Sequence, residues 1–251
     1  MIDLVRLSDE GLINWLRARL QKWEFMYGHA FSEQEICENI YKMLFQERST
    51  KLKDIEQYFV PFSQANYLTA RQKLEIMIFV LEKERGNRHQ FLCELGRMSI
   101  VNEQWIDKLY LNWVVEDRLH LSPEDKKAFF VRSLSDRLGL GVFSVLERIA
   151  MDGILLGELC PSPNNEPSEK RIAVYNNGKI IMLPFLALEE KEELIRIIKA
   201  VVARENNGEL TVMEPFWECV RDDGTYITAV RPPAGKDWGL RILYVSGERS
   251  R

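Results

Sequence analysis

The sequence predicts an α+β protein of 251 residues, with an all-helical module in residues 1–121 followed by a module with an antiparallel sheet and packed helices in residues 122–251. Three observations predict this fold class. Apolar residues recur at helical spacing through the first half. After about Met151 they alternate in short segments separated by turn residues. One amphipathic segment, residues 189–205, interrupts these short segments. A run of helices followed by strands in this manner is typical of an α+β fold.

Four helix starts in the first 140 residues can be identified by their capping residues. A Ser, Thr or Asn side chain accepts a hydrogen bond from a backbone N–H of the first turn, and Glu or Gln three residues later completes a capping box. The four starts are Ser32 with Glu35, Thr69 with Gln72, Asn102, and Ser122 followed by Pro123. We expect the helix that begins after Ser122 to end near Gly139, because glycine is common just after a helix.

The second module contains the signals of a hairpin, a helix and a meander of strands. In RIAVYNNGKIIML, residues 171–183, Asn177-Gly178 predicts a type I′ turn between two strands. Residues 189–205 predict one helix, with its apolar residues turned inward. Residues 154–159 are a short apolar segment. Strands are expected at residues 216–221, 225–231 and 239–245, and the turn Asp222-Asp223-Gly224 should pair the first of these with the second.

Composition excludes several classes of function. With 34 basic and 38 acidic residues the net charge is −4, which gives no electrostatic basis for binding nucleic acid. The longest apolar run, residues 76–81, is far shorter than the roughly 20 residues that cross a bilayer. The N-terminus lacks the features of a signal peptide, so we expect a cytoplasmic protein without direct membrane insertion. The four cysteines and three histidines are scattered, without the spacing of a metal site.

Five segments of the second half occur in a specific order. They are SLSDRLGLGVFSVLERIAMDG, LLGEL, IAVYNNGKI, PFLALEEKEELIRIIKAVV and, as the most specific piece, EPFWECVRDDGTYITAVRPPAGKDWGLRI. In order and spacing, over residues 122–245, they resemble the N-terminal region of the type II and type IV secretion ATPases. The branch that assembles tight-adherence (Flp-type) pili is the most similar. Residues 1–121 have no part in this resemblance.

The resemblance implies a PAS-like domain that packs on a RecA-like ATPase core, which binds ATP and Mg²⁺ and works as a hexameric ring. It also implies that arginines on the sheet of the domain contact the phosphates of the nucleotide. Arg241 matches the arginine that the family retains, and Arg231 is a second candidate. Tyr226 stands at the Asp-Gly-x-Arg position, so the charge expected there is lost.

The chain lacks the motif that would make it an ATPase by itself. A P-loop needs G-x-x-x-x-G-K-[ST], and neither Gly178-Lys179 nor Gly235-Lys236 is followed by Ser or Thr. We therefore expect no ATP hydrolysis and no cofactor in this chain, with no catalytic or metal-binding residues assigned. The absence of a recognisable catalytic constellation makes an unrelated enzyme the weakest hypothesis.

Two hypotheses remain open. The first is a regulatory and assembly region that closes over nucleotide held by an adjoining core, with neighbouring subunits of a hexamer and an inner-membrane platform as partners. The second is a stand-alone adaptor of a secretion or pilus machine with a degenerate PAS-like domain. Either would be cytoplasmic and peripheral to the inner membrane through its partners. Whether the chain is a fragment or a complete protein is equally open.

Overall fold

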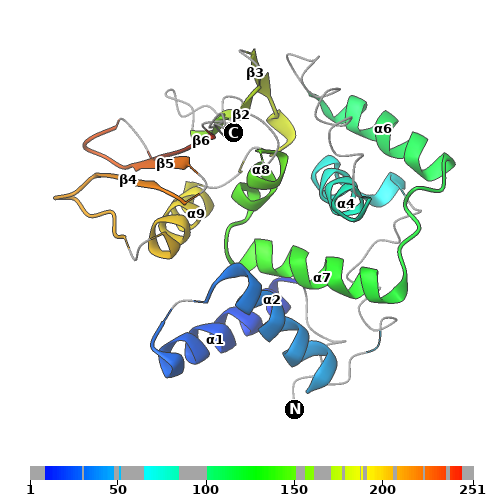
Figure 1. Ribbon diagram of the computed structural model, residues 1–251, viewed down its shortest axis with the longest axis horizontal. Coiled ribbons are helices and arrows are strands. Elements are labelled where there is room, and N and C mark those ends of the chain that lie inside the picture. Colours follow the sequence, from blue (N-terminus) through cyan, green and yellow to red (C-terminus); the bar gives the residue numbers. More distant parts are fainter. Residues whose placement is uncertain are drawn as a thin grey trace, which may run out of the picture. The chain divides into compact units, whose positions relative to one another are not determined.

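The computed structural model shows the α+β fold that the sequence predicts (Figure 1). It describes residues 9–29, 31–47, 51, 65–84, 101–150, 156–160, 171–176, 179–186, 188, 191–205, 208–222, 224–235 and 238–244. The α-helices are α1 (Asp9–Tyr27), α2 (Glu33–Tyr41), α4 (Ala70–Lys83), α6 (Glu103–Val115), α7 (Pro123–Leu138), α8 (Val142–Ala150) and α9 (Lys191–Arg204). Shorter helical segments are η2 (Lys42–Gln46), η4 (Ala65–Tyr67) and η6 (Pro184–Leu186). The strands are β1 (Leu156–Cys160), β2 (Arg171–Asn176), β3 (Lys179–Met182), β4 (Phe216–Val220), β5 (Thr225–Val230) and β6 (Gly239–Tyr244).

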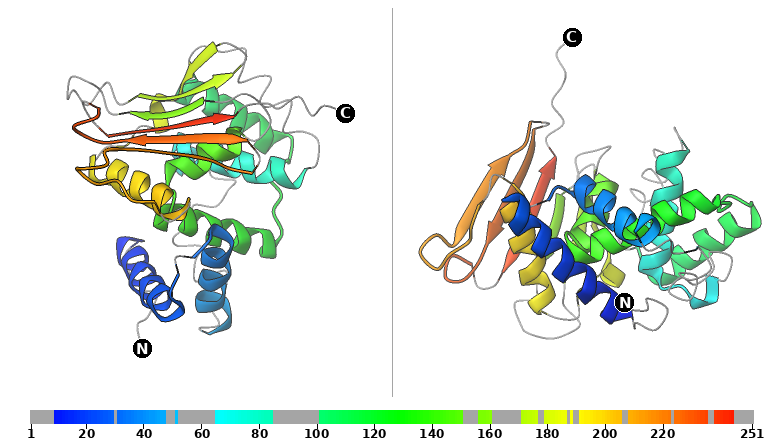
Figure 2. Two further views of the ribbon diagram at one scale, coloured as in Figure 1. Left: turned by 60° about the vertical axis from the view of Figure 1, so that its left-hand side comes forward. Right: turned by 90° about the horizontal axis from the view of Figure 1, so that it is seen from below.

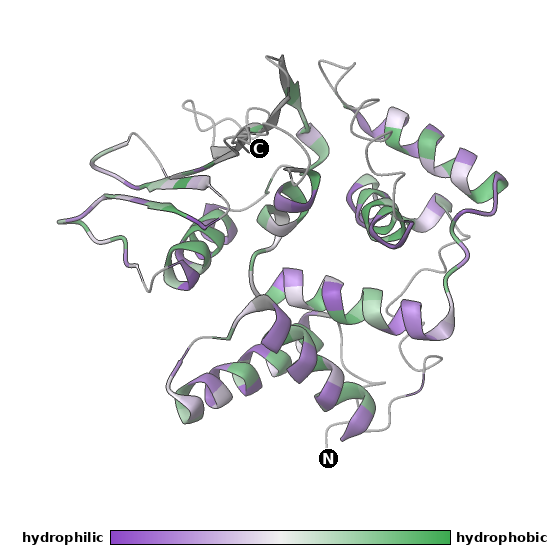
Figure 3. Cartoon of the chain, in the orientation of Figure 1, coloured by the Kyte–Doolittle hydropathy of each residue, from purple (hydrophilic) through white to green (hydrophobic). Residues whose placement is uncertain are grey.

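The chain divides into two compact units. Unit 1 comprises Met1–Val80 and Asp107–Gly141, and unit 2 comprises Leu81–Ile106 and Val142–Arg251. The boundary predicted between residues 121 and 122 falls inside unit 1, because α7 shares a hydrophobic core with α1 and α2. Hydrophobic and hydrophilic residues alternate along each of these helices, as expected for helices that bury one face (Figure 3). The shared core consists of Leu12, Ile13, Leu16, Leu20, Phe31, Ile36, Ile40, Met43, Leu44, Phe130, Val131 and Leu134.

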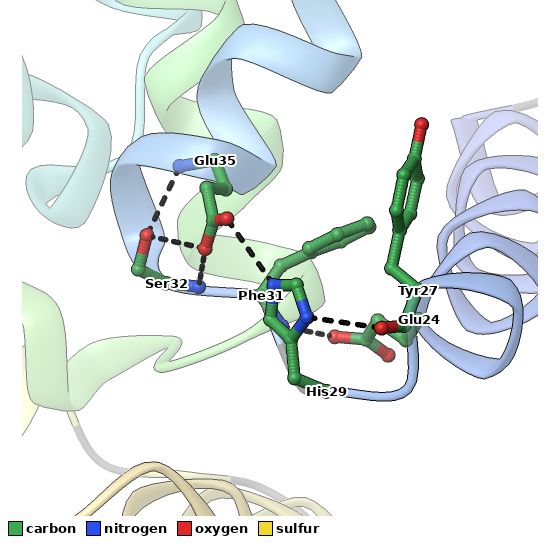
Figure 4. Close-up of polar contacts among 6 residues, drawn as sticks. All are labelled: Glu24, Tyr27, His29, Phe31, Ser32 and Glu35. Atoms are coloured by element: carbon green, nitrogen blue, oxygen red, sulfur yellow. Dashed lines mark hydrogen bonds and ion pairs between the residues drawn. The ribbon is translucent and has the colours of Figure 1, made fainter.

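The helix caps predicted from sequence are confirmed where the structure describes them. Glu35 N donates to Ser32 Oγ at 3.3 Å, and Ser32 N donates to Glu35 Oε2 at 2.8 Å, which completes a capping box. His29 Nε2 lies 3.3 Å from Glu35 Oε1, and Phe31 N donates to Glu24 Oε1 at 2.9 Å (Figure 4). These contacts fix the connection between α1 and α2, so we assign His29 a structural role.

The other three predicted starts also carry their caps. Gln72 N donates to Thr69 Oγ1 at 3.2 Å, and Trp105 N donates to Asn102 Oδ1 at 3.0 Å. Ser122 caps α7, and Gly139 is its C-cap, as predicted.

Unit 2 is built on a six-stranded sheet in the order β3-β2-β1-β6-β5-β4, in which every neighbouring pair is antiparallel. Two three-stranded meanders, β1 to β3 and β4 to β6, meet at the central pair of β1 and β6. Helix α9 connects them and lies against one face of the sheet (Figure 2). The residues of α9 predicted to face inward are all buried: Leu194, Ile197, Ile198, Val201 and Val202.

The predicted pairing of β4 with β5 is confirmed. Val220 is the partner of Tyr226, and the connecting turn ends at Gly224, whose φ of 82° favours glycine over residues with a side chain. The hairpin of β2 and β3 is also confirmed by the pair Asn176 and Lys179. Its predicted turn, Asn177-Gly178, lies outside the described residues.

Among the described helices, none combines the length and the apolar character that crossing a membrane requires.

Candidate functional site on the outer face of the sheet

The face of β4, β5 and β6 turned away from α9 is the candidate site, and we call it the outer face. Along β5, residues 225, 227 and 229 are buried while the alternate residues are partly exposed. Directly paired residues on neighbouring strands share a face, so the register extends this pattern to β4 and β6. The outer face thus consists of Phe216, Glu218, Val220, Tyr226, Thr228, Val230 and Arg241.

Two large apolar side chains are exposed on this face. Phe216 is 53% exposed and Val220 is 63% exposed, although both belong to a strand. Val212 and Met213, just before β4, are 62% and 89% exposed. Four exposed apolar residues therefore lie within nine positions of the sequence, with the exposed Glu214 and Glu218 among them.

Tyr226 and Glu218 form a pair on the outer face. The Tyr226 hydroxyl donates a hydrogen bond to Glu218 Oε2. This bond is the main reason why the pKa of Tyr226 is raised, with smaller contributions from burial and from the Glu218 charge. At the position where the resemblance implies an arginine, the protein therefore holds a neutral hydroxyl that is bound to a carboxylate. This pair does not attract phosphate.

Arg241 lies on the outer face, in the middle of the sheet. It is the direct partner of Thr228 on β5, and Thr228 is in turn the partner of Glu218 on β4. The Arg241 side chain is exposed to solvent. Its position is therefore compatible with contact to a molecule that docks on this face.

Arg231 lies on the opposite side of the sheet. Its guanidinium is 4.9 Å from the ring centroid of the buried Trp238, and Lys199 of α9 is 6.0 Å from the same ring. Arg231 Nε also donates to Pro232 O at 3.3 Å, and Nη1 to Leu210 O at 3.4 Å. These contacts hold Arg231 on the α9 side, so the two arginines predicted to bind phosphate do not converge.

In a cluster of charges that was not predicted from the sequence, one arginine joins two helices to a strand. Arg221 follows β4, Glu147 lies in α8 and Glu205 follows α9. Arg221 Nη1 donates to Glu147 Oε1 at 2.5 Å, and Arg221 Nε donates to Glu205 Oε1 at 2.8 Å. The side chains of Arg221, Glu147 and Glu205 are 27%, 14% and 21% exposed, respectively. No local sequence pattern predicts this cluster, because Arg221 is 74 residues from Glu147 and 16 from Glu205.

The electrostatics of the cluster favour the charged form of the arginine. Burial acts to lower the pKa of Arg221, but its hydrogen bonds and the charges of Glu205 and Glu147 outweigh this effect, so the pKa is raised. Nearby, burial and the charge of Glu205 raise the pKa of the Cys219 thiol, against a smaller effect of Arg221. All four groups are engaged in packing and ion pairing, so we assign this cluster a structural role.

The described residues contain no group of three or more His, Cys, Asp or Glu side chains arranged to hold a metal ion.

Comparison with known proteins finds no family model that matches the chain and no matching curated protein.

Proposed function

We propose that unit 2 is a non-catalytic interaction domain that binds another protein of a secretion or pilus-assembly machine through its outer face. The observation that carries this proposal is the exposure of Phe216 and Val220 on a regular strand, beside Glu218 and Arg241. The sequence resemblance to secretion ATPases supports the choice of machine. On this proposal the chain is an adaptor whose PAS-like domain does not sense nucleotide.

The chemistry of the outer face suits a protein partner better than a nucleotide. Protein interfaces typically combine an apolar centre with a polar rim, and a few aromatic or arginine side chains supply most of the binding energy. Phe216 and Val220 would provide the apolar contacts, with charged contacts from Glu218 between them on β4 and from Arg241 on β6. Arginine side chains are favoured for phosphate recognition, whereas Tyr226 here donates to a carboxylate and Arg231 stacks on Trp238.

The exposure of Arg241 favours a second candidate function. Here the domain would be the regulatory and assembly region of a secretion ATPase, closing over nucleotide held by a RecA-like core. Arg241 would then contact phosphate across the interface, within a hexamer bound to an inner-membrane platform. Both candidates place the chain in the cytoplasm, held at the inner membrane by its partners and not by insertion.

Site-specific photo-crosslinking in the native cell tests the first candidate. A benzophenone amino acid at position 216 should form adducts with a RecA-like ATPase or a platform protein of the machine, identified by mass spectrometry. Position 115 is the control, because Val115 is 85% exposed but belongs to unit 1. Adducts at position 216 only with proteins of unrelated systems, or the same adducts at both positions, would refute the proposal.

The two candidates are separated by nucleotide dependence. If the purified complex forms equally well with ATP, with ADP and without nucleotide, the adaptor function holds. If nucleotide changes the affinity of the chain for its partner, and Arg241→Ala removes that change, the regulatory function replaces the adaptor function.

A further inference from the structure

Strand β4 forms one edge of the sheet, with β5 as its neighbour in the strand order. Arg221 N donates to Thr225 O, and Arg231 N donates to Pro215 O, both at 2.9 Å. In an antiparallel ladder, hydrogen-bonded and non-hydrogen-bonded pairs alternate, so the odd-numbered residues of this segment bond to β5. The backbone N–H and C=O groups of Phe216, Glu218 and Val220 therefore point away from β5, along the edge.

Among the described residues, this edge carries one of the usual protections, the charged side chain of Glu218. In the part of the chain that the structure describes, no loop or further strand makes backbone hydrogen bonds along it. Natural edge strands commonly carry charged side chains, especially Lys, or Pro or a bulge, each of which hinders pairing with another chain. The sequence of β4, FWECV, has neither Lys nor Pro, and its ladder with β5 runs without a bulge from Phe216 to Val220.

We propose that β4 accepts an extended segment of a partner protein as an additional strand. The segment would present apolar, basic and apolar side chains at alternate positions on the outer face. This inference rests on the proposed function, because it names the form in which the protein partner is recognised.

The positions of the open backbone groups and the charge of Glu218 determine which segment would bind. Phe216, Glu218 and Val220 provide both the open backbone groups and the outer-face side chains, so the added strand would place its own side chains directly beside them. The hydrogen bond that Glu218 accepts comes from a neutral hydroxyl, which leaves the carboxylate charge for a basic residue opposite. A second copy of β4, paired symmetrically about Glu218, would instead bring two carboxylates together, which disfavours a homodimer in that register.

The test uses the full chain and the synthetic peptide acetyl-Val-Thr-Lys-Thr-Val-amide, followed by NMR amide shifts. We expect saturable shifts at Phe216, Glu218 and Val220. A peptide with Glu in place of Lys should bind about fivefold more weakly, which is the upper range for one cross-strand charge pair. A peptide with N-methyl groups on the amides that face β4 should not bind, because it cannot complete the ladder.

A charge reversal in the protein tests the same contact with the same two peptides. Glu218→Lys should reverse the preference between the two peptides, while Glu209→Lys, at another exposed position, should leave it unchanged. Absence of saturable shifts with either peptide, or equal binding of the N-methylated peptide, overturns the inference. Shifts at the edge that depend on protein concentration alone would assign it to a second copy of the chain. Neither result affects partner binding through the outer face, which the crosslinking experiment measures separately.

Discussion

Replacement of Arg221 by Met should destabilise unit 2. The substitution leaves Glu147 and Glu205 facing each other without their shared cation. Removal of one partner from a fully buried ion pair costs roughly 3–5 kcal/mol. The three side chains keep between 14% and 27% exposure, so water partly solvates the remaining carboxylates. After this discount we expect a loss of about 2 kcal/mol in the free energy of unfolding.

Urea-induced unfolding followed by tryptophan fluorescence measures this loss, and the thermal midpoint should fall by about 4–8 °C for a chain of this size. Arg196→Met is the matched control, because Arg196 pairs with Glu193 within one turn of α9, where such pairs contribute below about 0.5 kcal/mol. Additional Glu147→Gln and Glu205→Gln substitutions should recover part of the stability by removing the charges left behind. Equal stability of the Arg221→Met and Arg196→Met variants would refute the argument.

Three further predictions concern packing, capping and thiol chemistry. Gly208→Ala should cost about 1–3 kcal/mol and change tryptophan fluorescence, because a Cβ at Gly208 would overlap the Trp217 indole. Ser32→Ala should cost about 1 kcal/mol in urea unfolding through loss of the cap of α2. At pH 8, iodoacetamide should alkylate Cys219 far more slowly than Cys37, read by mass spectrometry, because Cys219 is buried and its pKa is raised. Folding raises the pKa of the Cys219 thiol. The thiol therefore contributes to the free energy of unfolding in full below its unfolded-state pKa, and this contribution is lost as the pH rises through the pKa of the folded state. Comparable alkylation rates, or unchanged stability of either variant, would contradict the corresponding argument.

The sequence predicts the parts of the fold that local chemistry determines. The Ser32 capping box and the turn at Gly224 each depend on a few adjacent residues, so both could be recognised without a structure. The pairing of β1 with β6 depends instead on residues more than 80 positions apart, such as Leu156 and Leu243, and nothing local selects it. Assignment of α7 to unit 1 likewise depends on packing with α1 and α2 that its own sequence does not specify.

The candidate site, too, could be predicted from the sequence only in part. Strand alternation alone places Arg231 on the face opposite Val230, so its position on the α9 side could have been derived from the sequence. The position of Arg241 beside Thr228 and Glu218 required the register of three strands. The exposure of Phe216 could not be derived, since an aromatic residue on a strand is usually taken for core.

Calorimetric binding of the purified chain to the partner captured at position 216 tests whether the outer face is the binding surface. We predict that Phe216→Asp weakens this binding at least about tenfold, as loss of an aromatic anchor does in other interfaces. Val115→Asp, an equally drastic change at an exposed position of unit 1, should leave the affinity unchanged. Equal affinities of the wild-type chain and the Phe216→Asp variant would contradict the assignment of the outer face as the binding surface.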